Sequence, residues 1–421
     1  MEPTINHPSR LSPAQHQAIL SSILHHVQGQ NLPSPPLDSD LQALSTFYSS
    51  LPNSIQAEIN SNLSSTIELP IPLPWLLQQQ AYINSAITWS PYTSLTDDYR
   101  VQGANKSGGF SLLDPIVVTK IRSVGTEILK QLGKKILSGN FNLTHISFPI
   151  RCMQASTVLQ NTLKTFQMIP LYITRAVATK DPLERLKLVI VSTLSSFVNT
   201  STFEKPLNPI LGETQHGLLE DGTQLYSEQI SHHPPVSSFF IEGNLYKIYG
   251  YFNYTAKAGL NSVTVSNIGK RTFEFFDGYK AVVSCPEELF SGTFFGTMRH
   301  ESLGTMQASD NEGHTCLISI GKIKGKPSDY LEGQIRKEGS GTVSTLTGTY
   351  LGYLEFDGVR YWDERTVNPF SIKYTQTLDS DSESRKDIKA LRTGDINYAQ
   401  QAKEELEDLQ RLDRKLRGKN S

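Results

Sequence analysis

The sequence is poor in cysteine and has no long apolar run. Its 421 residues include three cysteines, Cys152, Cys285 and Cys316, and no two of them are close together. Few and scattered cysteines are typical of a reducing compartment, and they supply neither a disulfide framework nor a metal-binding pair. The first residues have neither the basic nor the apolar region of a secretory signal, and no apolar run approaches the roughly 18 residues of a membrane span. We therefore expect a cytoplasmic protein without a metal, which binds membranes reversibly if it binds them at all.

The sequence also lacks an excess of basic residues. It holds 39 lysines and arginines against 41 aspartates and glutamates, for a formal net charge of −2. Proteins that bind nucleic acid through its phosphates are usually basic, so we expect no nucleic-acid partner. Attraction to an anionic membrane would have to come from a local basic patch. With 38% hydrophobic residues, the chain can build one large domain with an extension.

Composition divides the chain into three parts. Residues 1–112 are rich in Ser, Gln and Pro, which predicts a partly helical extension. Residues 113–145 predict an amphipathic helix with a linker, and residues 146–421 the main domain. The amphipathic helix can lie on an anionic bilayer, close over an apolar cavity or simply pack on its own core. Its apolar face consists of Val124, Ile128, Leu129, Leu132 and Ile136.

The main domain begins with helical patterns and continues with strands. We predict helices over 153–165 and after Asp181-Pro182, where Asp caps and Pro opens the first turn. From 224 to 376, short segments of alternating polarity are separated by Gly-rich turns, which is typical of an antiparallel β-barrel or sandwich. A charged helix is predicted over 394–417. The fold class is therefore α+β and mainly β.

The stretch Glu228-Gln229-Ile230-Ser231-His232-His233-Pro234-Pro235-Val236-Ser237 has an unusual composition. The prolines fix the backbone of a turn, which can bring the two neighbouring imidazoles into one site. Their ring nitrogens can bind an anion or a polar head group. Because an apolar run follows at once, the pattern is typical of a site for an amphiphile. A zinc half-site and a turn without any ligand are the alternatives.

Two further stretches carry candidate binding residues. Lys205-Pro206-Leu207-Asn208-Pro209 predicts a proline-braced loop that holds a lysine and an asparagine in place, as a phosphate site requires. In the last helix, Lys403, Glu407 and Arg411 are spaced four residues apart, so they share one face. On spacing alone, the pattern favours a solvated helix with salt bridges.

These three stretches together resemble the oxysterol-binding protein family. The matching motifs are EQISHHPPVS, KPLNPILGE and K-x-x-x-E-x-x-Q-R, in the family's order. The resemblance implies a short, single-domain lipid-transfer protein with a large, nearly closed antiparallel β-barrel around a hydrophobic tunnel. It also implies that the helix within 113–145 is a lid and that a C-terminal helix completes the domain. No cofactor, catalytic residue or obligate protein partner is expected.

The resemblance further implies the ligands. One is phosphatidylinositol 4-phosphate, and the other is a second lipid, sterol or phosphatidylserine-like, which is exchanged for it between membranes through the same tunnel. Phe197 stands where sterol-binding members carry a glutamine, so the second lipid stays open. Binding of the phosphoinositide head group is implied for Lys205, Asn208, His232, His233, Lys403, Glu407 and Arg411.

Three alternatives remain at this point. A lipid sensor would bind the same lipids without moving them. A hydrolase could use Ser231 and His232, although such groups usually come from separate elements and no G-x-S-x-G motif is present. Finally, Glu274-Phe275-Phe276-Asp277-Gly278 resembles the motif by which larger family members bind a receptor of the endoplasmic reticulum. Because it ends an alternating segment, we predict that it is a strand and a hairpin turn.

Overall fold

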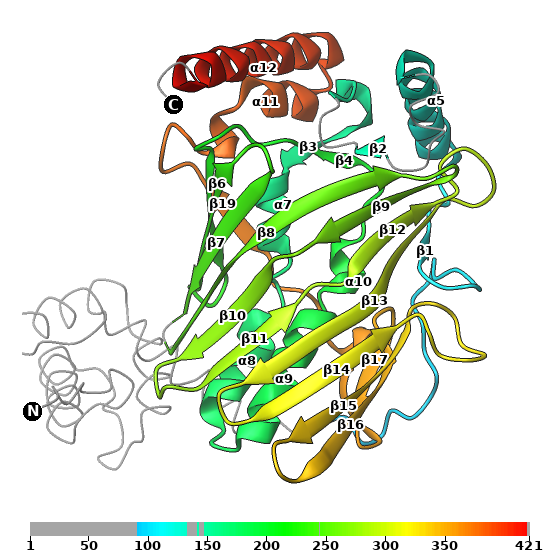
Figure 1. The fold of residues 1–421 in the computed structure, drawn as a ribbon, viewed down its shortest axis with the longest axis vertical. Helices are drawn as coiled ribbons and strands as arrows, with labels where there is room; N and C mark the ends of the chain where they lie inside the picture. The colour runs from blue at the N-terminus through cyan, green and yellow to red at the C-terminus, as the bar shows by residue number, and fades with distance from the viewer. Residues whose placement is uncertain (1–90, 133–140, 143–146, 244, 419–421) are drawn as a thin grey trace, which may run out of the picture. The chain divides into compact units, whose positions relative to one another are not determined.

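The computed structural model describes residues 91–132, 141–142, 147–243 and 245–418. The chain divides into two compact units, and the larger one, residues 91–176 and 181–421, contains the sheet. It is mainly β and antiparallel, with helices packed against a large sheet, as predicted (Figure 1). Among the described residues, no helix is both long and apolar enough to cross a membrane.

Every neighbouring pair of strands in the sheet is antiparallel, and β19 and β18 form its two edges. One half is formed by β19 (Ile372–Thr375), β5 (Thr214–Leu219), β6 (Gln224–Ser231), β7 (Val236–Glu242) and β8 (Tyr246–Ala258). The other half is formed by β13 (Arg299–Asp310), β14 (His314–Ile320), β15 (Tyr330–Lys337), β16 (Gly341–Thr349), β17 (Tyr353–Phe356) and β18 (Val359–Asp363). The short strand β1 (Phe110–Ser111) pairs with β13, and the short strand β2 (Phe141–Asn142) pairs with β8. Among the described strands β18 and β19 do not pair with each other, so the sheet curves but stays open.

Two long strands, each interrupted near its middle, join the halves. β9 (Ser262–Asn267) and β10 (Lys270–Phe275) both pair with β8. β11 (Lys280–Ser284) and β12 (Glu287–Ser291) both pair with β13. The interruption after β9 contains Gly269, where any Cβ would lie 1.7 Å from the Tyr251 carbonyl oxygen. A glycine is therefore required where the chain between β9 and β10 passes the backbone of β8.

Burial along these strands separates a filled part of the interior from an open part. In β10, Arg271, Phe273 and Phe275 are buried and alternate with exposed or half-buried residues, as in a strand that covers a packed core. In β9, by contrast, the residues of both faces are half-buried, and most of β12 shows the same pattern. Partly accessible side chains on both faces indicate that the interior beside β9 and β12 is less tightly filled, although Val263 of β9 packs against the buried Val124 and Ile128.

Helices lie on the inner side of the sheet and along one of its rims (Figure 1). α7 packs on β5, β6 and β7, whereas α9 packs on β11, β13 and β18. The helices are α5 (Pro115–Leu132), α7 (Val158–Lys164), α8 (Ile169–Ala178), α9 (Pro182–Leu194), α10 (Phe197–Thr200), α11 (Lys386–Thr393) and α12 (Ile396–Gly418). The predicted Asp181 cap of α9 is confirmed, since its side chain accepts from the Leu183 amide.

The helix predicted over 153–165 is only half correct. Its first part is strand β3 (Met153–Thr157), which pairs in parallel with β4 (Lys205–Leu207). The helix begins at Val158, because Thr157 forms a capping box with Gln160. The side chain of each of these two residues bonds the backbone amide of the other, which fixes the start of the helix.

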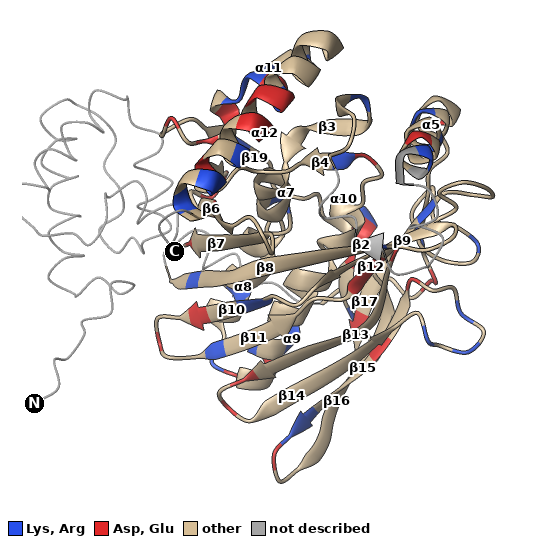
Figure 2. Ribbon diagram, turned by 45° about the horizontal axis from the view of Figure 1, so that its top comes forward, with Lys and Arg blue, Asp and Glu red and all other residues tan. Residues whose placement is uncertain are grey.

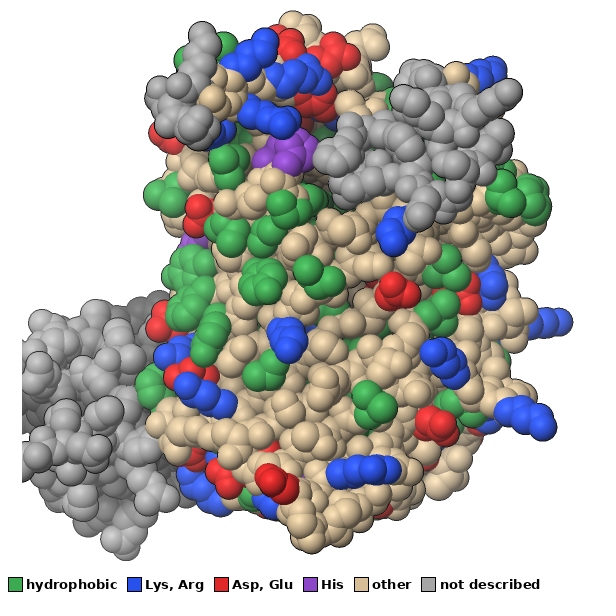
Figure 3. Space-filling view, in the orientation of Figure 1, with side chains coloured by type: hydrophobic (Ala, Val, Ile, Leu, Met, Phe, Trp, Pro, Cys, Tyr) green, Lys and Arg blue, Asp and Glu red, His purple; other side chains and the backbone are tan. Residues whose placement is uncertain are grey.

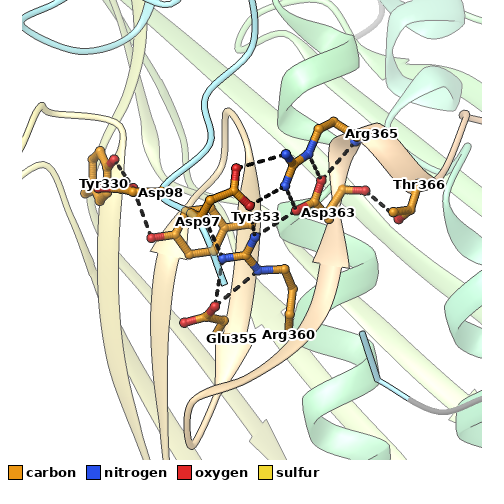
Figure 4. A network of polar contacts seen from close by, with 9 residues as sticks. All are labelled: Asp97, Asp98, Tyr330, Tyr353, Glu355, Arg360, Asp363, Arg365 and Thr366. Atoms are coloured by element: carbon orange, nitrogen blue, oxygen red, sulfur yellow. Dashed lines mark hydrogen bonds and ion pairs between the residues drawn. The ribbon is translucent and has the colours of Figure 1, made fainter. Parts of the chain in front are cut away.

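Residues 91–105, which we call the strap, lie along the far strands β15–β18. Arg100 donates to Asp329, which is fully buried at the end of the loop before β15. Asp97 accepts from Arg365, and Arg360 donates to the Asp97 carbonyl oxygen (Figure 4). Residues 91–112, predicted as the end of the extension, are thus bound to the sheet, while residues 1–90 lie outside the described residues.

The stretch 274–278 has the predicted form of strand and turn. Glu274 and Phe275 end β10, and the chain reverses into β11 through Gly278, which has a φ of +91°. Phe275 is buried, and Asp277 pairs with Arg185 of α9 at 2.5 Å. The motif is therefore part of a folded hairpin.

Candidate functional site

The histidine pair lies in the turn between β6 and β7. β6 ends at Ser231, which is the register partner of Val236 at the start of β7. The prolines occupy this turn, as predicted, and the peptide between His233 and Pro234 is cis. His232 is half-buried and His233 exposed, and the centres of their rings are 4.4 Å apart. Both imidazoles therefore belong to one rim of the sheet.

The proline-braced loop starts in β4 and places its lysine next to its asparagine. Lys205 Nζ donates to Asn208 Oδ1 at 2.6 Å and lies 5.5 Å from the centre of the Phe148 ring. Buried Arg385 donates to the Asn208 carbonyl oxygen at 2.9 Å and pairs with Glu213 at 3.0 Å. Because Glu213 also accepts from the Ile210 amide, this ion pair fixes the backbone of the loop at Asn208 and Ile210. The loop is thus positioned before any ligand binds.

The last helix contributes a chain of charges, as the spacing predicts. Lys403 Nζ lies 2.5 Å from a Glu407 carboxylate oxygen, and Arg411 lies 3.1 Å from the other. Ser147 joins them, since its hydroxyl accepts from Lys403 at 2.7 Å and donates to Glu407 at 2.8 Å. α12 rests on the domain through Ala399 and Ala402, both buried. The ribbon of Figure 2 shows basic and acidic residues interleaved along α11 and α12.

These segments enclose one cavity of about 510 Å³. In Figure 3, histidine side chains lie beside basic side chains at this edge of the molecule. Lys205 is not itself in the lining but reaches it through Asn208. The lining includes six of the seven predicted residues, namely Asn208, His232, His233, Lys403, Glu407 and Arg411. It also has an apolar part formed by Phe148, Met153, Leu207, Ile210, Leu211, Ile230 and Leu406.

The electrostatics favour an anion in this cavity. Burial, together with the nearby Lys403 ammonium, lowers the pKa of Lys205 to about 8. Partial burial opposes ionisation of Glu407, yet the hydrogen bond and charge of Lys403 bring its pKa below the ordinary value. Glu407 is therefore a carboxylate that two cations already share. Arg385, another cation of the lining, pairs with Glu213 and Asp387, neither of which lines the cavity.

The predicted lid corresponds to α5. Val124 and Ile128 are 2% and 5% exposed and pack in an apolar cluster with Ile150, Met153 and Leu207, next to the cavity. Leu129 and Leu132 also belong to α5, while Ile136 lies outside the described residues. The Asp114 side chain caps the helix by accepting from the Ile116 amide at 2.8 Å. Lys120 ties α5 to Glu204 at 2.8 Å, directly before the proline-braced loop.

Several residues of the site were not found from the sequence. Arg414 and Arg417 line the cavity beside Arg411, and their spacing of three along α12 could have revealed them. Ser147 and Phe148 precede β3 without any motif. Arg385 had no local signal either, because its partners Asn208 and Glu213 are far away in the sequence. Such long-range pairs leave no periodic pattern.

Two further observations concern the alternatives. Among the described residues, no group of three or more His, Cys, Asp or Glu side chains could hold a metal ion. Phe197 is buried at the start of α10 and meets Tyr350 edge to face, with 6.0 Å between the ring centres. It therefore presents a ring, and no hydrogen-bonding group, at its position.

Comparison with known proteins gives a consistent result. A family model described as oxysterol-binding protein matches residues 128–421. Oxysterol-binding protein 9 of Dictyostelium discoideum is 31% identical over 348 residues, which cover 75% of this chain and 81% of that protein. Oxysterol-binding protein homolog 3 of Saccharomyces cerevisiae is 27% identical over 302 residues, 64% of this chain but only 30% of that longer protein.

Solved structures share the fold. The Osh1 ORD domain in complex with cholesterol has a TM-score of 0.62 at 20% identity, covering 82% of this chain and 89% of that one. The Osh3 ORD of Saccharomyces cerevisiae in complex with PI(4)P has a TM-score of 0.57 at 22% identity, covering 78% and 89%. At these identities the similarity concerns the fold and not the ligand.

Proposed function

The chain belongs to the oxysterol-binding protein family, and on this premise we propose that it binds phosphatidylinositol 4-phosphate and a second lipid in turn and exchanges them between membranes. Solved relatives of this fold hold a sterol in one case and PI(4)P in another. The carrier would act in the cytoplasm and bind membranes peripherally. No bond in either lipid is broken.

The observation that carries this proposal is the convergence of three distant segments on one cavity. Lys403 and Arg411 of α12 and both histidines of the β6–β7 turn line it, and Lys205 lies behind Asn208. Hydrogen bonds between a cation and a phosphate are about twice as strong as neutral ones. Asn208 and Glu407 would orient the inositol ring by accepting from its hydroxyls. The cavity therefore has the charge and the polarity that a phosphorylated sugar needs.

The acyl chains would lie in the open interior bordered by β9 and β12. Exposing each CH₂ group to water costs about 0.8 kcal/mol, so a lipid leaves a membrane slowly unless its chains are covered. α5 supplies such a cover, since Val124 and Ile128 face the apolar cluster beside the cavity. Because two lipids compete for one interior, uptake of one at a membrane releases the other there. The two lipids would then be carried in opposite directions and exchanged between the membranes. The buried ring of Phe197 leaves the identity of the second lipid, sterol or phosphatidylserine-like, to experiment.

The test removes the two imidazoles with His232→Ala and His233→Ala together. Liposomes containing fluorescent phosphatidylinositol 4-phosphate are mixed with the protein, and extraction is measured after the liposomes are pelleted. We expect extraction to be lost while the second lipid, identified by mass spectrometry of co-purifying lipids, is still bound. The control is Lys386→Ala with Lys389→Ala, which removes two exposed cations from α11 outside the cavity. Equal loss of both lipids in a folded histidine variant would contradict the assigned role.

The same assay separates the alternatives. A hydrolase using Ser231 and His232 would convert the phosphoinositide to product, whereas a carrier returns it intact. A sensor would extract lipid but would not deliver it to acceptor liposomes. Transfer between two liposome populations therefore decides between carrier and sensor.

A further inference from the structure

β10 carries a buried arginine below the rim of the sheet. Arg271 is 5% exposed and lies on the inner face of its strand. Its register partner on β8 is Gly250, which in turn pairs with Phe239 of β7. Phe239 is three residues along β7 from Val236, where the histidine turn ends, so Arg271 is level with a point about 10 Å along the strand direction from that turn. A guanidinium at this depth needs compensation for its lost water.

The described part of the chain supplies little of that compensation. The guanidinium makes one described hydrogen bond, from its Nη1 to Cys285 Sγ at 3.8 Å, and its Nε has no acceptor. The rings of Phe166 and Phe252 lie 5.8 and 5.1 Å away, which gives a cation–π contact but no counter-charge. Burial raises the pKa of Cys285, so its sulfur is a neutral thiol and a weak acceptor. No ion pair of Arg271 occurs among the described residues.

The acid near Arg271, Glu288, is bound to other residues. Glu288, whose charge also acts on Cys285, accepts from His300 at 2.8 Å and from Ser302 at 2.7 Å. Arg271 therefore has no matching acid among the described residues of this region. A buried cation of this kind is a group that a polar ligand can satisfy.

The region lies at the boundary between the filled and the open interior. Asn267, the last residue of β9, accepts from the Asn253 amide at 3.0 Å and donates to Cys285 at 3.4 Å. Arg271 follows directly after the interruption that separates β9 from β10. A ligand in the open space beside β9 and β12 would therefore bring its inner end to this point.

We infer that Arg271 is the centre of a second, interior subsite, which takes the anionic end of an amphiphile that enters with its polar group inward. The fitting chemistry is a carboxylate or a similar oxygen acid on an apolar body, which can accept two hydrogen bonds from a guanidinium. A neutral alcohol would leave the charge of Arg271 uncompensated. The inference deepens the proposed function and rests on its open interior, and it names the chemical class of the second ligand.

The experiment compares probes that differ only in this group. One pair is cis-parinaric acid and its methyl ester, followed by their own fluorescence. The other pair is phosphatidylserine and phosphatidylethanolamine in liposomes, which differ by the carboxylate. For at least one pair we expect the carboxylate form to bind about 10- to 100-fold more tightly to the wild-type protein. The pair that shows the preference tells whether a free acid or a phospholipid is the source.

The variant is Arg271→Met, which keeps an unbranched side chain and removes the charge. It should reduce binding of the acid to the level of its neutral partner and leave the neutral partner unchanged. Lys270→Met, on the exposed face of the same strand, is the matched control and should retain the preference. Because a buried, uncompensated charge is removed, the thermal midpoint of Arg271→Met should not fall.

The outcomes are distinct from those of the proposed function. If neither pair shows a preference, or if Arg271→Met retains it, the interior subsite is overturned. A fall in thermal midpoint with the preference intact would also overturn it, since Arg271 would then be purely structural. Extraction of phosphatidylinositol 4-phosphate is measured in parallel with wild type and Arg271→Met. If the wild-type protein does not extract phosphatidylinositol 4-phosphate but still prefers the acid, the head-group assignment is wrong and the interior subsite is retained.

Discussion

Lys205 is a cation whose charge changes within the physiological range. Burial brings its pKa to about 8, so it is mostly protonated at neutral pH and mostly neutral one unit above that value. Because a phosphate binds the protonated form, we predict that phosphoinositide affinity falls as the pH rises through this pKa. The loss of one charge-assisted hydrogen bond corresponds to about tenfold in affinity. Binding near this pH should also take up a proton, which calorimetry in buffers of different ionisation enthalpy measures.

The control for this prediction is Lys205→Met. Its affinity should be lower at neutral pH and nearly flat across the same interval. For the ligand-free protein the sign is opposite, since the unfolded chain holds the proton more tightly than the folded one. The contribution of Lys205 to the free energy of unfolding therefore grows as the pH rises above its folded pKa. A wild-type affinity that is constant through this window would rule out Lys205 as a phosphate partner.

At the residue scale, the sequence predicted side chains with a local signature. His232 and His233 stand out by composition, and Lys403, Glu407 and Arg411 by spacing. That these segments meet followed only from the resemblance, because no local pattern reports a contact across some 200 residues. Ser147, which bridges Lys403 and Glu407 from 256 and 260 positions away, could not be found in this way. The same holds for Arg271, which in the sequence is an ordinary strand arginine.

At the scale of elements, α5 gives the sharpest test of the lid. We predict that Val124→Asp loosens the helix from the apolar cluster, because a charge would have to be buried there. The loss of a bound fluorescent lipid should become faster by about an order of magnitude or more, since burying an unpaired polar group costs 1–3 kcal/mol. Stopped-flow transfer to excess acceptor liposomes measures this rate.

Thr126→Asp is the matched control for the lid. It introduces the same charge two residues away on the exposed side of α5, so the rate of lipid loss should stay near that of the wild type. If the two variants release lipid at the same rate, α5 does not cover the bound lipid. The ion pair of Lys120 with Glu204 is intact in both variants, which isolates the apolar contact.

The elements themselves were predictable where a pattern and a cap agree. α9 has both a periodic apolar face and the Asp181 cap, and its start was correct. In 153–165 the apolar residues suited a helix from the beginning, but Met153–Thr157 instead pairs with β4. That pairing depends on a strand about 50 residues later, and tertiary contacts override weak helical preference. The capping box of Thr157 and Gln160 was a usable signal for the true start.

At the scale of the whole molecule, the strap holds the end of the sheet far from the cavity. Arg100 is the cation for Asp329, a fully buried carboxylate that also accepts from Thr349 at 2.5 Å. We predict that Arg100→Met lowers the free energy of unfolding by about 3–5 kcal/mol, because it leaves this charge buried without a partner. Urea denaturation followed by tryptophan fluorescence measures the change.

Arg336→Met serves as the comparison for the strap. Arg336 is exposed on β15, and its loss should change the free energy of unfolding by less than about 0.5 kcal/mol. Equal stabilities of the two variants would show that the strap contributes nothing. The attachment of residues 91–112 to the sheet could not be predicted from the sequence, because their Ser- and Gly-containing composition is that of a linker. Their partners, such as Arg360 and Arg365, lie more than 250 positions later.

The pairing of Ser147 with Lys403 and Glu407 also has a consequence for biosynthesis. The ribosome releases Ser147, both histidines and the braced loop long before α12 emerges. A nascent chain therefore has most of the sheet but lacks the α12 residues that line the cavity. Lipid capture of the proposed kind then begins only when translation is almost complete. A frameshift or a premature stop that removes α12 would remove Lys403, Glu407 and Arg411 from the cavity, so we expect such a chain not to retain a phosphoinositide.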